Sequence, residues 1–422
     1  MNNVIPYKLN LKLYRHIMLI LLISTCIYWL DYYIFKYIPL PVDKILNNTS
    51  TIIICLFALI PILIRKKIYL PKQVIYFAVM IVVMTLTSIV SNSPTEYIPS
   101  LLRYSLYLFI FGLAYHIGKN SNESLSKKNY LSLNNFVILA VCLTIFFGFI
   151  EILLEDRLYF NGQFRSSGQF YQHPLAFALF LNIIIILWLE LFVNTIKWSM
   201  KNIIYIFILL LLVYFLLSTG SRLQIVALLV SYFIYYFFRI GNLTQAIKYL
   251  IYTSIVVLII TTVITQTTVA PRLSYMLAGK HDIFDSSTLL RVTMSIESIN
   301  NLDPLNYIIG IGLGGFSDYY SSISRFDQIA AHNNYLLFFI EGGIVGITLY
   351  LLFQINLFIF LLKKIRENPS IKIFKIAFLM FLSIDLFSFL QNNYYFYCSE
   401  SIVWMTYGLA FGKNKELNYN YS

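Results

Sequence analysis

Charged residues are scarce in this sequence. They make up 12% of its 422 residues, whereas a typical soluble domain carries roughly a quarter. Apolar residues make up 59%, and the mean hydropathy is +0.73. This balance excludes a soluble fold and predicts an all-α polytopic membrane protein, with room for about twelve transmembrane helices of roughly twenty residues each.

Patterns that hold metals or nucleotides are also lacking. The four cysteines lie in or beside apolar segments without paired or metal-ligand spacing, so packing is their expected role. The five histidines form neither an HxH nor an HxxxH pattern. The nearest match to a phosphate-binding loop, Gly112 to Lys119, is one residue too long and lacks a following Ser or Thr. We therefore expect no metal, no cofactor and a substrate that is already activated.

The net charge of +12 comes from positive residues spread over short loops, without a basic domain that would bind nucleic acid. Topogenic lysines explain most of this excess. With the N-terminus in the cytoplasm, 21 of the 31 Lys and Arg residues fall in cytoplasmic segments. This bias predicts that both termini are cytoplasmic and that residues 1–422 form a single integral membrane domain. The apolar runs place the spans at about 16–38, 50–64, 74–91, 101–118, 134–154, 175–193, 202–218, 223–238, 249–267, 333–362, 371–390 and 394–412.

The positive residues on the outer side differ in type from those inside. Seven of these ten are arginine, whereas lysine dominates in the cytoplasmic loops. Arginine presents a planar fork of donors that suits phosphate and carboxylate groups. Because topology does not require positive charge outside, an anionic substrate is one explanation for them. The seven are Arg103, Arg157, Arg165, Arg222, Arg272, Arg291 and Arg325.

Two outer segments are long enough to matter for function. The medium one, about 155–174, is rich in Gly, Asn, Gln and Ser and is predicted to be a loop. The large one, about 268–332, contains apolar residues at helical spacing between Leu289 and Ile299, which predicts a short amphipathic helix. Asp285 and Ser286 are its N-cap candidates, and Asp303-Pro304 ends it. A glycine-rich run at 310–316 follows as a flexible turn.

Two single residues in outer positions suggest chemistry. Arg222 lies in a minimal turn between two spans, where it either extends to lipid headgroups or binds a pyrophosphate or acidic glycan. His332 precedes an outward-facing helix, whose N-terminal dipole favours a neutral imidazole that can act as a general base. The alternative for His332 is an interfacial hydrogen-bonding role. Asn333 and Tyr335 are candidates for sugar binding, while the buried acids, including Glu341, are expected to be paired structurally.

Four blocks in this order resemble the O-antigen polymerase and O-antigen ligase superfamily. They cover about residues 155–365, and the fourth repeats the superfamily's His-Asn-x9-Gly-x-x-Gly element. The blocks are Arg165-x-x-Gly168 with His173-Pro174, Gly220-Ser221-Arg222, Arg291 leading to the run Gly310–Phe316, and His332-Asn333 followed by Gly343-x-x-Gly346.

This resemblance implies a GT-C-like fold and a metal-independent glycosyltransferase on the outer face of the bacterial inner membrane. Its donor would be a polyprenyl-pyrophosphate-linked oligosaccharide, and its partners membrane lipids and a chain-length regulator. By resemblance, Arg222 and Arg291 clamp the pyrophosphate and His332 activates the acceptor hydroxyl. The substrate-binding candidates beside this catalytic set are Arg157, Arg165, His173, Arg325, Asn333 and Tyr335.

The resemblance leaves the acceptor open. Polymerases often carry an Arg-x10-Gly element in each of two outer loops, and Arg157 to Gly168 matches it in the first loop only. We favour polymerisation of repeat units into O-antigen or capsular polysaccharide. The alternatives are ligation of the glycan to lipid A core or to protein, and transport by a lipid-linked glycan flippase.

Overall fold

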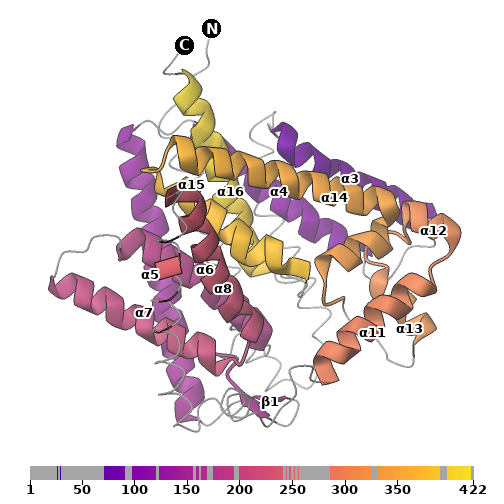
Figure 1. Ribbon diagram of the computed structural model, residues 1–422, viewed down its shortest axis with the longest axis horizontal. Coiled ribbons are helices and arrows are strands. Elements are labelled where there is room, and N and C mark those ends of the chain that lie inside the picture. Colours follow the sequence, from indigo (N-terminus) through magenta and orange to yellow (C-terminus); the bar gives the residue numbers. More distant parts are fainter. Residues whose placement is uncertain are drawn as a thin grey trace.

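The computed structural model of the protein describes most of the chain after residue 70. The described residues are 71–90, 97–119, 123–154, 158–160, 163–168, 174–193, 199–240, 286–324, 331–389 and 397–419, with positions 26, 29, 244, 247, 248, 251 and 255. Two three-residue strands and a set of helices make up this part of the chain (Figure 1). The fold is that of an all-α polytopic membrane protein.

Nine of the twelve predicted spans coincide with helical segments in the described part of the chain. These are α3 (Lys72–Val90), α4 (Tyr97–Lys119), α5 (Glu123–Leu153), α6 (Pro174–Phe192), α7 (Met200–Ser218), α8 (Arg222–Ile240), α14 (Asn334–Glu367), α15 (Lys372–Met380) with its continuation, and α16 (Tyr397–Tyr419). The predicted spans at 16–38, 50–64 and 249–267 lie almost entirely outside the described residues. The total of twelve therefore stays a prediction.

Length and composition single out the helices that can cross a bilayer. Five helices among the described residues qualify, namely α4, the Leu133–Leu153 part of α5, α6, α7 and α14. The apolar parts of α3 and α8 are slightly shorter. Helix α15 ends at Met380 and continues through one π-helical turn, Phe381–Asp385, and a 3-10 turn, Leu386–Phe389.

Aromatic side chains join the membrane helices at the centre of the fold. The indole ring of Trp404 in α16 lies 4.7 Å from the ring of Phe77 in α3 and stacks on Phe353 of α14 at 5.4 Å and on Tyr107 of α4 at 6.1 Å. Each such pair contributes about 0.5–1.5 kcal/mol beyond the area it buries. These contacts hold α14 beside α3 and α4. The start of α14, with His332 and Asn333 immediately before it, is called the His332 corner below.

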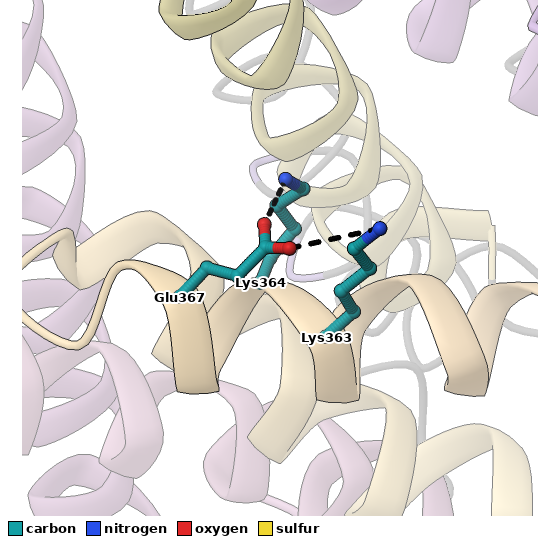
Figure 2. Close-up of polar contacts among 3 residues, drawn as sticks. All are labelled: Lys363, Lys364 and Glu367. Atoms are coloured by element: carbon teal, nitrogen blue, oxygen red, sulfur yellow. Dashed lines mark hydrogen bonds and ion pairs between the residues drawn. The ribbon is translucent and has the colours of Figure 1, made fainter.

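The last turn of α14 is charged, as expected of its predicted cytoplasmic end. The Glu367 carboxylate pairs with Lys364 and, at 3.6 Å, with Lys363 (Figure 2). Positive residues in the last turn also complement the helix dipole.

The two long segments that were predicted to lie on the outer side contain more structure than loops alone. Strands β1 (Leu158–Phe160) and β2 (Gln163–Arg165) pair as an antiparallel hairpin within the predicted 155–174 loop. The larger segment contains α11 (Ser286–Asn300), α12 (Pro304–Ile309) and α13 (Phe316–Ile323). Helix α11 covers the residues for which an amphipathic helix was predicted, and Figure 1 shows α11, α12 and α13 gathered at one edge of the molecule.

Candidate functional site

His332 lies immediately before the first turn of α14, where the sequence predicts a catalytic site. Asn333 is the N-cap of this helix: its Oδ1 accepts hydrogen bonds from the backbone N–H of Tyr335 at 2.8 Å and of Leu336 at 3.1 Å. An Asn cap satisfies N–H groups that have no partner within the helix. The cap fixes the backbone next to His332, whose side chain is half-buried. A sugar-binding role of Asn333 stays a prediction, and its Oδ1 serves the helix.

A small apolar cluster packs α11 against the same corner. Met294 of α11 is buried with Ala331 and with Leu336 and Leu337 of α14. Arg291 precedes Met294 by one helical turn and is itself half-buried. The helix of Arg291 therefore packs against the start of α14, which His332 precedes.

Tyrosine hydroxyls from α13 lock α11 in place. The Tyr319 hydroxyl donates to the backbone carbonyl of Ser298 at 2.8 Å, and the Tyr320 hydroxyl donates to Oε2 of Glu297 at 2.9 Å. Burial, together with the nearby negative charge of Asp303, raises the pKa of Tyr319 to about 12, so this hydroxyl keeps its proton and remains a donor. These bonds could not be predicted from the sequence, because they join residues from different helices.

Helix α14 is interrupted at Gly343, and the glycine-rich run hydrogen-bonds to the carbonyl groups that precede this interruption. Gly343 has φ 62° and ψ −160°, which interrupts the helix nine residues after it begins. The backbone carbonyls of Ile340 and Glu341 then accept hydrogen bonds from the N–H groups of Ile311 and Gly312, both at 3.0 Å. The Glu341 carboxyl also accepts from the backbone N–H of Phe316 at 3.4 Å, which confirms structural pairing for this acid.

These contacts correct an expectation about the glycine-rich run. We expected the 310–316 run to be a flexible turn, but its backbone is bound to α14 and, through Leu313 N–H and the Met84 carbonyl at 3.2 Å, to α3. Gly343 lies directly against the backbone of α12 and also turns the chain, because a residue with φ +62° is strained unless it is glycine.

A second group of candidates meets at the end of α7. The backbone N–H of Ser166, which follows Arg165, donates to the carbonyl of Ser218 at 3.1 Å. Four residues after Ser218, Arg222 begins α8. This bond brings the backbone next to Arg165 against the turn that leads to Arg222. Figure 1 shows β1 and the adjoining ends of α7 and α8 at the same edge of the view as the lower end of α11.

The side chains of Arg165 and Arg222 are not among the described ones, and Arg157, His173 and Arg325 lie outside the described residues. Their predicted contacts with substrate stay predictions. Within the described ranges, no three His, Cys, Asp or Glu side chains lie together as a metal-binding group.

Glu151 is a residue that sequence reasoning missed. Its buried carboxyl group, near the end of α5, accepts hydrogen bonds from the Ser166 hydroxyl, from the Ser167 N–H at 2.7 Å and hydroxyl at 3.1 Å, and from the Gly168 N–H at 3.0 Å. The carbonyl of Gly168 accepts in turn from Nε1 of Trp29 at 3.0 Å. Glu151 therefore anchors the Arg165-x-x-Gly168 block. An acid inside an apolar run, 14 residues before an Arg-Ser-Ser-Gly loop, is the only signal in the sequence.

Replacing Glu151 by alanine is expected to destabilise the protein by about 2–4 kcal/mol, because buried donors left without an acceptor each cost about 1–3 kcal/mol. Thermal unfolding of the purified protein in detergent measures this loss. Glu367→Ala is the matched control, since its ion pairs with Lys363 and Lys364 are partly exposed and such pairs contribute about 0–1 kcal/mol. Equal effects of the two substitutions would show that Glu151 anchors nothing.

The fold and the site together define a helical membrane protein with a packed unit of short helices beside the start of α14. A family model described as O-antigen ligase matches residues 207–351, about a third of the chain. This segment contains Arg222, Arg291 and His332. A search of curated proteins found no match. The family match supports placing the chain in the O-antigen ligase and polymerase superfamily, and with it a glycan ligation of the ligase or polymerase type.

Proposed function

We propose that the protein polymerises polyprenyl-pyrophosphate-linked oligosaccharide repeat units on the outer face of the bacterial inner membrane. The observation that carries this proposal is the apolar cluster that packs α11, the helix of Arg291, against the start of α14, which His332 precedes. A general base and a cation on elements that pack together suit the displacement of an anionic leaving group. The family match over the same residues supports it further.

In the proposed reaction, His332 accepts the proton of an acceptor sugar hydroxyl. The acceptor oxygen forms a bond to the anomeric carbon of the donor sugar, and the bond from that carbon to the pyrophosphate oxygen breaks. The electron pair leaves with the polyprenyl pyrophosphate. Arg291 and Arg222 stabilise the negative charge that develops there, and no metal is required. Tyr335, Arg165, Arg157, His173 and Arg325 are proposed to contact the glycan or its pyrophosphate.

The orientation of the protein follows from its positive charges. Both termini are proposed to be cytoplasmic, because the charged end of α14 and most lysines then lie inside. The His332 corner then faces the outside, where lipid-linked repeat units await transfer. A chain-length regulator is the proposed protein partner.

Deleting the gene separates the three functions that the chain can have. Loss of a polymerase leaves glycans capped with a single repeat unit. Loss of a ligase leaves polymer attached to polyprenyl pyrophosphate, and this second candidate is favoured by the description of the matching family. Loss of a flippase leaves repeat units in the cytoplasmic leaflet. Gel analysis of the glycans, with fractionation of the lipid-linked pool, distinguishes these outcomes, and either of the last two would contradict polymerisation.

Arg291→Ala is expected to lower the rate of glycan transfer by about 10²–10³-fold, the usual effect of removing one group that stabilises a developing charge. Arg291→Lys keeps the charge but loses the planar fork, so it should recover only part of the rate. A transfer assay with purified protein and lipid-linked donor measures both. The control is Arg366→Lys, at the opposite end of α14, which should retain full activity. An Arg291→Ala protein with normal activity would remove Arg291 from the mechanism.

A further inference from the structure

Residues 304–316, which comprise α12 and the glycine-rich run, pack against two membrane helices. A Cβ atom on Gly343 of α14 would lie 2.3 Å from the carbonyl oxygen of Ile308. One on Gly312 would lie 2.6 Å from the hydroxyl oxygen of Ser88 in α3. The backbone of this segment therefore touches α3 and α14 directly, with no side chain between them.

The contact with α14 lies well inside that helix. Gly343 follows the start of α14 at Asn334 by nine residues, which is about 13 Å along the axis at roughly 1.5 Å per residue. Ile344 and Val345, the next two residues, are exposed on an apolar helix that is long enough to cross a membrane. In a bilayer, exposed apolar residues of a membrane-spanning helix contact lipid. The 304–316 segment thus lies at the level of lipid-facing residues.

The backbone of the segment is hydrogen-bonded in the way that a lipid environment demands. Its N–H groups at Ile311, Gly312 and Leu313 donate to carbonyls of α14 and α3, as described above. The Thr87 hydroxyl donates to the carbonyl of Ile309 at 3.2 Å, and the Ser88 hydroxyl to that of Leu313 at 3.4 Å. Non-helical backbone at membrane depth is tolerated only where protein satisfies its polar groups.

The outward surface of the segment is apolar. Leu305 and Ile308 are 65% and 54% exposed, and no residue between 304 and 316 carries a charge. Val292 and Ile296 of α11 are also exposed, at 49% and 54%. These two belong to the apolar spacing that predicted an amphipathic helix, and they remain exposed in the part of the chain that the structure describes.

We propose that residues 304–316 form a re-entrant segment in the outer leaflet, with Leu305 and Ile308 in contact with lipid acyl chains. The exposed residues Val292 and Ile296 are proposed to contact lipid as well, so that α11, which carries Arg291, rests on the bilayer. Residues 268–332 are then not wholly extramembrane. The proposal stands on packing and exposure and does not depend on which reaction the protein catalyses.

Fluorescent labelling at single cysteines tests this placement. The starting protein has its four native cysteines replaced by alanine, and Ile308→Cys or Leu305→Cys then carries a bimane label in vesicles of phosphatidylcholine. Brominated phosphatidylcholine is expected to quench the label at either position at least twofold, and aqueous iodide to have little effect. Ile344→Cys serves as the lipid-facing reference, and Ser322→Cys, exposed on α13, as the aqueous one.

Quenching of residues 305 and 308 by iodide, as strong as at residue 322, would overturn the proposal. Protection from both quenchers would also overturn it, because it would mean that protein covers this face. Two positions are used so that a local disturbance at one of them does not decide the result.

Discussion

Replacing His332 by alanine is expected to abolish the long glycan in cells and to lower the rate of transfer in vitro by about 10²–10⁴-fold, the contribution of a positioned general base. The physical reason is that the backbone next to His332 is held in place, which positions this side chain to act as a base. His332 adjoins a helix whose first turn is capped by Asn333 and packed against α11. The transfer assay with lipid-linked donor measures the rate.

Two further variants separate catalysis from structure at this corner. His332→Gln can still form hydrogen bonds but cannot accept a proton as imidazole does, so it should be as inactive as His332→Ala. Asn333→Asp retains the cap and should leave the protein folded, whereas Asn333→Ala should lose about 1 kcal/mol of stability. Normal glycan length in cells that carry His332→Gln would refute the role of a base.

Replacing Gly343 by alanine is expected to destabilise the protein by about 3–5 kcal/mol, since backbone strain and overpacking each cost about 1–3 kcal/mol. The new Cβ would lie 2.3 Å from the carbonyl oxygen of Ile308 and 2.6 Å from the backbone nitrogen of Ile309. Neither atom can move as the end of a flexible side chain could. Thermal unfolding and the yield of monodisperse protein in detergent report the loss.

The neighbouring glycine supplies the matched control. A Cβ on Gly342 would approach Cγ of Met84 to 3.1 Å, and this side chain can shift. Gly342→Ala should therefore be tolerated far better than Gly343→Ala. If both variants unfold at the temperature of the unchanged protein, the break at Gly343 does not constrain the fold.

The sequence was sufficient to predict most of the membrane helices that the structure describes. Apolar runs such as 174–192 and 200–218 are long and uninterrupted, so their identity needs no knowledge of tertiary contacts. The break in α14 could not be predicted in the same way. Gly343 lies in an otherwise apolar helical run, and only its contact with Ile308 reveals why the helix is interrupted there.

The candidate site was predictable in part for a related reason. His332 and Asn333 stand at a visible change from polar to apolar sequence, and Asn333 is a recognised cap residue. Arg291 could be placed on a helix, but the packing of that helix against the start of α14 could not be predicted, because it depends on a tertiary cluster that includes Met294 and Leu336. Glu151 was missed because its partners, Ser166 to Gly168, come from the following loop.

The hydrogen bonds between α3 and residues 304–316 affect the order in which the protein can fold during synthesis. During synthesis α3 enters the membrane long before its partners exist, since Thr87 and Ile309 are 222 residues apart. The carbonyl of Met84 likewise lacks this hydrogen bond until Leu313 has been synthesised. Until the ribosome has passed residue 343, the end of α3 near Val90 lacks the neighbours that complete it. A nascent chain halted before this point is expected to remain accessible to membrane proteases and chaperones.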